Sequence, residues 1–275
     1  MAQSWQSYGA AAANHDRVAA PAIFAPPARD LVALAEIPPG AAVLDVGTGT
    51  GVAALEAQKS AGPKATVAGV DPSLEMLRFA REHGVLTMAV GRVPGLPFAD
   101  GTFNRVLASF VLTHCPSYRD AIADMVRVLR PRGKLGVTAW GQPDEVRERW
   151  QALAESFVPK ADLDAAVEQA LPWEDWFRNA ANLQLALREA GLVDVAVHSR
   201  AYKTRIRIAD FLTMRCTSTQ GRFMRQALGD AGWKQCEQAI ADAFYREFPD
   251  PLDHRSEAHV AMGAKPDAHP GVESG

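Results

Sequence analysis

Apolar runs and amphipathic segments alternate along the middle of the chain. Between the runs, apolar residues recur three and four positions apart, as at Ile122, Met125 and Leu129, which is the period of a helix with one buried face. Five runs are hydrophobic enough for strands that helices cover on both faces: 43–46, 65–70, 85–90, 103–112 and 135–140. Strand alternating with helix predicts an open, doubly wound α/β sheet, mostly parallel. Residues 130–133 are expected to close the helix before the last of these strands.

The two ends of the chain have a different pattern from its middle. Residues 1–40 predict a helical cap, in which we favour a packed Tyr8 and a solvated or capping His15 over ligand-binding roles. Later segments predict two further strands, which makes seven. The predicted division is a cap at 1–40, a core at 41–207 with a helical excursion at 141–180, a helical lid at 208–250, a closing strand at 251–264 and a disordered tail at 265–275.

A glycine-rich turn joins the first strand to the helix after it. Asp45 precedes three glycines at alternate positions, Gly47, Gly49 and Gly51, with Thr48 between them. Glycines allow close approach of a ligand to the backbone, and a helix start offers unpaired amide hydrogens. The turn therefore predicts a nucleotide-like ligand. Its spacing is Gly-x-Gly-x-Gly, whereas the dinucleotide fingerprint is Gly-x-Gly-x-x-Gly.

Asp71 ends the second strand, 20 residues after Gly51. A carboxylate there can accept hydrogen bonds from both hydroxyls of an adenosine ribose. The alternative is that Asp71 and Pro72 only cap the following helix, as a good N-cap and first helical residue. We favour the ribose role, and the two roles are compatible. In a doubly wound sheet, ligands bind beyond the carboxyl ends of the strands, where Gly47, Asp71, Arg92, Ser109 and His114 lie.

The composition of the chain disfavours some classes of binding partner. Among 275 residues the formal net charge is −3, and no dense basic block occurs, which disfavours nucleic acid. Three scattered cysteines suggest neither a disulfide framework nor a metal site. The first residues lack the pattern of a signal peptide, and no segment is expected to span a membrane. We expect a cytoplasmic protein that acts on a small molecule, with its oligomeric state, a homo-oligomer included, left open.

Four motifs in order resemble the class I S-adenosylmethionine-dependent methyltransferases, in the group typified by ubiquinone and menaquinone biosynthesis. They are 43–51 (VLDVGTGTG), 69–73 (GVDPS) with Met76, 96–103 (LPFADGTF) and 129–135 (LRPRGKL). The resemblance covers residues 40–140 well and the remainder by architecture. It implies a Rossmann-like fold and S-adenosylmethionine as cofactor, with S-adenosylhomocysteine as product.

The resemblance also implies roles for individual residues. Asp45 and the glycine turn (Gly47, Thr48, Gly49 and Gly51) belong to the site for the amino acid part of the cofactor. Asp71 binds the ribose, and Pro72 and Met76 pack on the adenine. Ser109 and His114 lie near the sulfonium. Arg92 and Val93 replace an Asp-Ala pair that commonly contacts adenine, and an arginine cannot accept the adenine amino hydrogen. Asn104 replaces an acid, which we interpret as a structural change.

His114 is the only residue nominated as a general base, with a ligand-contacting or helix-capping imidazole as the alternative. The leading hypothesis is methyl transfer to an oxygen or carbon of a small, largely apolar metabolite. A second hypothesis, motivated by Arg92, is a non-methylating reaction such as a cyclisation in the same pocket. A third, a nicotinamide-dependent oxidoreductase, is disfavoured by the glycine spacing and by the lack of a Tyr-x-x-x-Lys pair.

Overall fold

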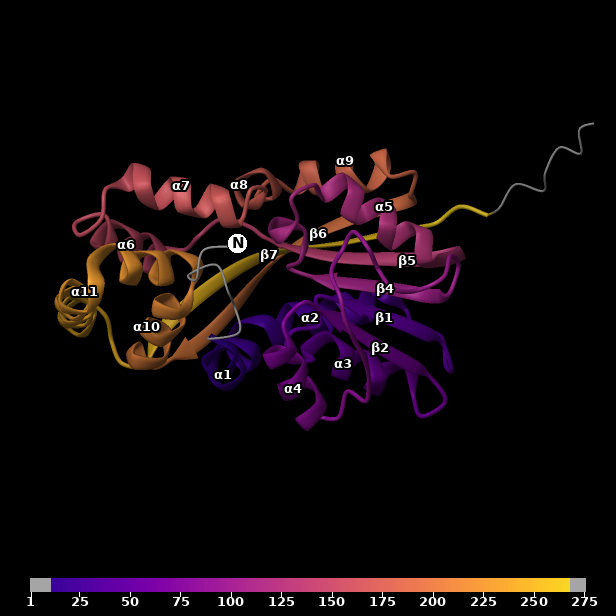
Figure 1. Cartoon of the computed structure of the whole chain (residues 1–275), viewed down its shortest axis with the longest axis horizontal. Helices are drawn as coiled ribbons and strands as arrows, with labels where there is room; N and C mark the ends of the chain where they lie inside the picture. The colour runs from indigo at the N-terminus through magenta and orange to yellow at the C-terminus, as the bar shows by residue number, and fades with distance from the viewer. Residues whose placement is uncertain (1–10, 268–275) are drawn as a thin grey trace, which may run out of the picture.

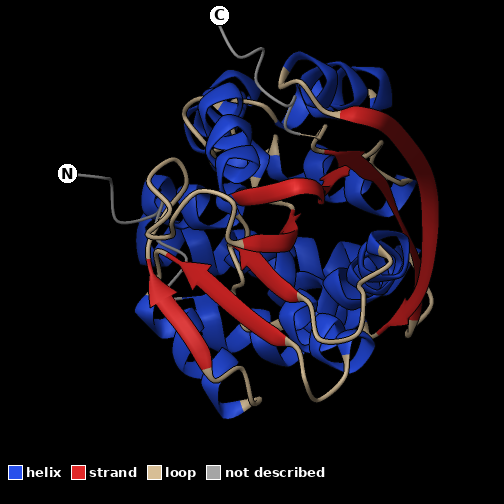
Figure 2. Cartoon of the chain, turned by 90° about the vertical axis from the view of Figure 1, so that its right-hand side faces the viewer, coloured by secondary structure: helices blue, strands red, loops and turns tan. Residues whose placement is uncertain are grey.

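A seven-stranded sheet forms the centre of the computed structural model, which describes residues 11–267. The strand order is β3-β2-β1-β4-β5-β7-β6, and the first five strands are parallel, while β7 is antiparallel to both of its neighbours. The strands are β1 (Ala42–Val46), β2 (Thr66–Asp71), β3 (Thr87–Val90), β4 (Phe103–Ser109), β5 (Leu129–Trp140), β6 (Val193–Ile206) and β7 (Leu252–Ala264). The predicted seven-stranded, mostly parallel sheet is confirmed (Figure 2).

Helices cover both faces of the sheet. On one face, small and aliphatic side chains such as Leu31, Ala54 and Ala80 pack from α2 (Ala25–Ala35), α3 (Val52–Ala61) and α4 (Leu74–Glu82). On the other face, larger side chains such as Ile122 and Leu183 pack from α5 (Tyr118–Val128), α8 (Glu174–Phe177) and α9 (Ala180–Glu189). Coverage on both faces explains why the parallel strands are nearly continuous in their hydrophobicity.

A second group of helices forms a lid beside the sheet. It consists of α6 (Glu145–Ala154), α7 (Lys160–Ala170), α10 (Ile208–Thr217) and α11 (Thr219–Glu247). These helices share their own hydrophobic core, which contains Trp150, Phe211 and Phe244 together with the strand ends Ile206 and Leu252. Figure 1 shows this lid at the left, joined to the sheet by the long strands β6 and β7. The lid is therefore anchored to the same hairpin that completes the sheet.

The N-terminal segment runs as α1 (Ala12–Asn14), the π-helix η3 (His15–Phe24) and then α2. Hydrogen bonds fasten it to β6: the Tyr202 hydroxyl donates to Asp30 at 2.7 Å, and the Thr204 hydroxyl donates to the carbonyl of Ala22 at 3.1 Å. Within the described residues, Ala12–Ala35 is long and apolar enough to cross a membrane, against the sequence expectation, but 56% of its apolar window is buried inside the protein. The cytoplasmic location stays a prediction.

At the end of β4 and the start of β5, the structure gives the reason for a boundary that differs from the sequence prediction. Strand β4 ends at Ser109, not at residue 112, because Phe110 takes a left-handed φ of 58° and donates its N–H to the Thr138 hydroxyl at 2.9 Å. Strand β5 begins at Leu129, so residues 130–133 are not a simple turn. They form an irregularity inside the strand, across which the pairing with β4 shifts register. The structural interpretation of Asn104 is confirmed, since its side-chain oxygen accepts from the Ala42 N–H at 2.9 Å.

The predicted disordered tail begins at Lys265, which the structure places, whereas residues 268–275 lie outside the described residues. The Lys265 ammonium donates to the carbonyls of Val126 and Leu129, each at 2.8 Å, so it satisfies carbonyls at the end of α5. We expect Lys265→Met to lower the free energy of unfolding by about 2 kcal/mol, because two carbonyls lose a charged donor. Urea unfolding measures this change. Lys64→Met, at an exposed position, is the control, and equal stability of both variants would refute the anchoring role.

Candidate functional site

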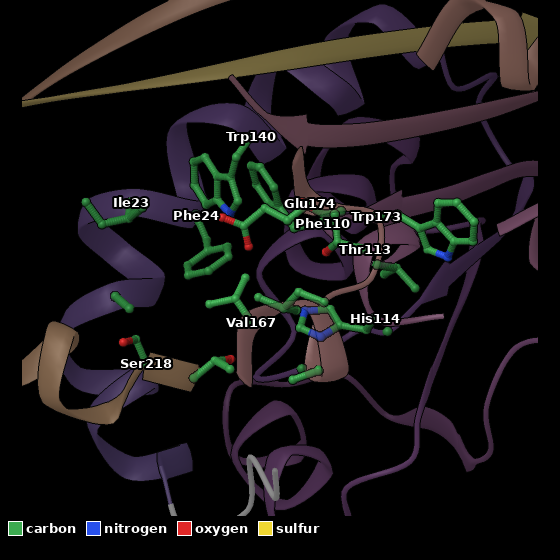
Figure 3. Close-up of a pocket in the computed structure, with 18 of the residues that line it drawn as sticks. Ile23, Phe24, Phe110, Thr113, His114, Trp140, Val167, Trp173, Glu174 and Ser218 are labelled. Atoms are coloured by element: carbon green, nitrogen blue, oxygen red, sulfur yellow. The ribbon is translucent and has the colours of Figure 1, made fainter. Parts of the chain in front are cut away.

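A large cavity of about 2030 Å³ opens where the carboxyl ends of β1, β2, β4 and β5 face the lid. This edge contains the switch point between β1 and β4, at which the strand order reverses and at which open α/β sheets bind ligands. Figure 3 shows aromatic side chains, His114 and Glu174 around the cavity, with Val167 and Ser218 on the lid side. The volume exceeds that of a typical site for one small ligand, so there is room for two.

The glycine turn forms one wall of the cavity. Gly47 has a φ of 65°, and a Cβ added there would lie 2.5 Å from a methyl group of Val111, so a side chain is excluded. Gly49 has a φ of 55°, and a Cβ added there would meet nothing within 4 Å. The first residue forms a close contact between β1 and the segment after β4, and the second leaves the backbone open to a ligand.

Asp71 supports this turn from the neighbouring strand. One carboxylate oxygen accepts from the Gly49 N–H at 2.9 Å, and the other accepts from the Ser73 N–H at 2.8 Å. Burial raises the pKa of Asp71, against the effect of these two hydrogen bonds. The N-cap of α4 is Ser73, whose hydroxyl accepts from the Met76 N–H, so the N-cap alternative for Asp71 is wrong. Each carboxylate oxygen keeps a second lone pair for a ligand hydroxyl.

Asp45 lies beneath the turn and is 1% exposed. Its Oδ2 accepts from the Thr48 hydroxyl at 2.7 Å and from the Ala54 N–H at 3.0 Å. Its Oδ1 is buried and has no hydrogen-bond partner among the described residues. Burial raises the pKa of Asp45 to about 7. A buried carboxylate oxygen without a donor, beside a cavity, fits a cationic group on a ligand.

Most of the other predicted cofactor residues lie in the segments that follow β2 and β3. Pro72, Met76, Arg92 and Val93 all line the cavity; Met76 and Val93 are buried, whereas Arg92 is exposed. Gly51 does not line it. A Cβ there would lie 2.8 Å from Val85 and 3.3 Å from Ala80, so Gly51 allows α3 to pack against its neighbours. Its inclusion among the cofactor contacts is therefore corrected to a packing role.

Aromatic side chains line the cavity beyond Ser109. The rings of Phe110 and Trp140 stack with centroids 3.8 Å apart, and Phe24 lies edge-on to both, at 5.4 and 5.5 Å. Phe24 comes from η3, Phe110 follows β4 and Trp140 ends β5, so three distant segments build this wall (Figure 3). Ser109 lies at its base, with its hydroxyl 3.3 Å from that of Thr138. The wall suits a flat, apolar molecule.

His114 ends the short 3₁₀ helix η4 (Leu112–His114) and points into the cavity (Figure 3). His114 is exposed to the open space of the cavity that it lines. The surrounding protein nevertheless desolvates the ring and lowers its pKa to about 4; Arg222 adds to this decrease, and Glu174 acts in the opposite direction. The imidazole is therefore neutral at physiological pH.

Sequence reasoning did not identify the side of the cavity that η3, α8 and the lid form. His15 lines the cavity instead of being solvated or acting as a cap, and its buried Nδ1 has no hydrogen-bond partner among the described residues. Glu174, which is 6% exposed, accepts from Arg147 at 2.8 Å and pairs with Arg178 at 3.3 Å.

The sequence contained a signal for Trp140, because this residue ends a parallel strand as Ser109 does. The lid residues had none, since only tertiary packing brings them to the cavity. Tyr8 lies outside the described residues.

Fold and site together define a class I methyltransferase architecture. Residues 43–133 match the family model of the methyltransferase domain. The chain is 32% identical over 171 residues to a demethylmenaquinone methyltransferase of Staphylococcus aureus, which covers 58% of this chain and 71% of that protein. The chain therefore belongs to the class I S-adenosylmethionine-dependent methyltransferases, in the group related to the ubiquinone and menaquinone enzymes.

Other similarities extend over different parts of the chain. It is 34% identical over 191 residues to the nocamycin O-methyltransferase of Saccharothrix syringae, covering 62% of this chain and 66% of that protein. A Mycobacterium tuberculosis relative is 37% identical over 123 residues, which is 43% of this chain and only 44% of that protein. A crystal structure of a putative methyltransferase from Bacillus halodurans has a TM-score of 0.52 at 18% identity, covering 87% of this chain and 98% of that chain, and shows the shared fold.

Proposed function

We propose that the chain transfers a methyl group from S-adenosylmethionine to an oxygen or carbon of a small, largely apolar acceptor by in-line displacement. The observation that carries the proposal is one cavity that joins the glycine turn of β1 to the aromatic wall of Phe24, Phe110 and Trp140. When bound, the donor supplies a methyl group on a positively charged sulfur. The remaining catalytic contribution, alignment and exclusion of water, comes from the protein itself.

The residues of the turn fit the donor. Asp45 Oδ1 would accept from the donor's ammonium group, and the open backbone at Gly49 would lie along its amino acid part. Asp71 would accept from the ribose hydroxyls, while Met76 and Val93 would pack on the adenine. Arg92 is exposed at this edge, where its guanidinium plane is free to lie on the purine or to point to solvent.

His114 is the candidate residue near the methyl group to be transferred, but its low pKa limits its strength as a general base. A base with a pKa of about 4 removes a proton from an ordinary phenol, with a pKa near 10, only against a cost of about 8 kcal/mol. His114 would therefore serve an acceptor that ionises by itself, such as an acidic enol, by accepting a hydrogen bond or holding its orientation. An acceptor of this kind requires no general base.

The His114 assignment predicts a titration that NMR can follow without a known acceptor. We expect the His114 ring signals, assigned with a His114→Gln variant, to show no titration between about pH 5.5 and 8, because the folded pKa lies near 4. In denaturing urea the same ring should titrate with the ordinary pKa of about 6.5. Titration near neutral pH in the folded protein would restore His114 as an effective general base.

Methyl transfer is tested by product stoichiometry. With a panel of small phenols, enols and carboxylic acids, the purified chain should release one S-adenosylhomocysteine for each methylated product. A product of unchanged mass, formed without S-adenosylhomocysteine, would instead support the cyclisation alternative. Substrate turnover that oxidises NADH would support an oxidoreductase and contradict the proposal.

A further inference from the structure

Arg215, on α10, lies in the wall of the cavity without an acidic partner. Its guanidinium carbon is 4.2 Å from the centre of the Trp150 ring, and one Nη donates to the Gln220 side-chain oxygen at 3.0 Å. Its Nε is buried and has no hydrogen-bond partner, and no carboxylate among the described residues lies within 4 Å of the guanidinium. Burial and the nearby Arg147 lower the pKa of Arg215 to about 9, although Glu174 and Asp144 act in the opposite direction, and the guanidinium is still charged at neutral pH.

Three acids that line the cavity are engaged with other groups. Glu174 is held by both Arg147 and Arg178. Asp144 accepts from His254, 2.7 Å away, and from two backbone N–H groups. A third acid, Glu155, accepts from the Gln151 amide. Glu174 and Asp144 favour the charged form of Arg215 from a distance, but none of the three acids forms an ion pair with it.

Neighbouring groups fix the orientation of Arg215 instead of neutralising it. The Gln220 amide donates to Gln151 at 2.7 Å, which turns its oxygen toward Arg215. Trp150 is 1% exposed and holds the guanidinium plane from beneath. The protein thus holds a charged group in a partly desolvated position, which costs free energy unless an anion completes the site.

We propose that Arg215 is a specificity-determining residue that binds a carboxylate or similarly acidic group of the methyl acceptor. This inference rests on the proposed function. The donor's own carboxylate has a separate place at the start of α3, where Val52 and Ala53 line the cavity and the first amides of the helix lack intrahelical acceptors. A guanidinium fork matches a carboxylate in geometry as well as in charge. The acceptor is then a flat molecule with an acidic group, bound between the aromatic wall and the lid.

A stability measurement separates this role from a structural one. Arg215→Met removes the charge but keeps an unbranched side chain that can lie on Trp150. If Arg215 awaits an anion, the variant without ligand should unfold at a midpoint about 2 °C or more above that of the wild type, because an uncompensated charge is gone. A lower midpoint would assign Arg215 to the packing of the lid and contradict the proposal.

A binding measurement tests the ligand class directly. With the protein saturated with S-adenosylhomocysteine, 1-naphthoate should bind at least about tenfold more tightly than neutral 1-naphthamide, and Arg215→Gln should abolish this preference. Arg188→Gln, at an exposed position on α9, is the control and should retain it. Equal affinity of the two probes for the wild type, or binding of neither, would overturn the inference.

The same titrations distinguish the two proposals. Arg215→Gln should leave S-adenosylhomocysteine affinity within about twofold of the wild type. A tenfold loss would show that Arg215 binds the donor's carboxylate and would overturn the assignment to the acceptor. Failure of the wild type itself to bind S-adenosylhomocysteine would instead refute the proposed function.

Discussion

Replacing Asp71 with alanine is expected to weaken the binding of S-adenosylhomocysteine by at least about a hundredfold. The carboxylate would accept from the ribose hydroxyls of the ligand, and hydrogen bonds to a charged acceptor contribute about 1.5–3 kcal/mol each. It also accepts from the N–H groups of Gly49 and Ser73, so its removal loosens the glycine turn and the start of α4 together. Calorimetric titration of the variant and the wild type measures the loss.

A second substitution separates ligand contact from support of the turn. Asp71→Asn keeps one oxygen to accept from the Gly49 N–H but replaces the other with a donor, which cannot accept from a ribose hydroxyl. We expect this variant to approach the alanine variant in affinity while unfolding closer to the wild type. Wild-type affinity in both variants would remove Asp71 from the cofactor site.

Asp45→Asn is expected to change stability and donor binding in opposite directions. Burial raises the pKa of Asp45 to about 7, so between about pH 4 and pH 7 the folded protein holds a proton that the unfolded chain has lost. The contribution of Asp45 to the free energy of unfolding therefore falls as the pH rises through this range, and above pH 7 the ionised carboxylate costs roughly 2–4 kcal/mol. The asparagine variant escapes this cost.

Near pH 8 the Asp45→Asn variant should be more stable than the wild type by about that amount, and near pH 4 the two should converge. Its amide fits the site, since the oxygen can accept from Thr48 and Ala54 while the NH₂ replaces the unpartnered Oδ1. The same change should weaken S-adenosylhomocysteine binding at least about tenfold, because the ammonium loses a charged acceptor. Urea unfolding at both pH values measures the stability difference, with the exposed Glu82→Gln as control. An Asp45→Asn variant less stable than the wild type at pH 8 would contradict the raised pKa of Asp45.

The sequence predicts the core of this fold well because its signals are local. Near-continuous apolar runs mark β1, β2 and β5, and the glycines at 47 and 49 mark a turn with positive φ, which packs closely on Val111 at Gly47 and is open at Gly49. The end of β4 is less visible. Phe110 continues the apolar run, yet its backbone turns into the left-handed region to bond with Thr138 and to stack on Trp140, and both partners lie on another strand. The periodicity of apolar residues carries no information about partners on another strand.

The lid side of the site is invisible in the sequence for the same reason. Phe24 and Arg215 are separated by more than a hundred and ninety residues of chain, and only the packing of η3 and α10 brings them to one cavity. In the sequence, Arg215 is one of many arginines. What distinguishes Arg215 is that no carboxylate forms an ion pair with it. Recognising this requires the positions of all nearby carboxylates, which the sequence does not give. The predicted domain boundaries likewise stay a prediction.

Calorimetric titration of the wild-type chain with S-adenosylmethionine, S-adenosylhomocysteine and NADH tests the donor site most directly. We expect both sulfur ligands to bind at one site with micromolar dissociation constants and NADH not to compete, because the glycine turn and Asp71 fit one adenosine with an amino acid attached. Binding of NADH in place of the sulfur ligands, or binding of none of the three, would contradict the assignment of this cavity to methyl transfer.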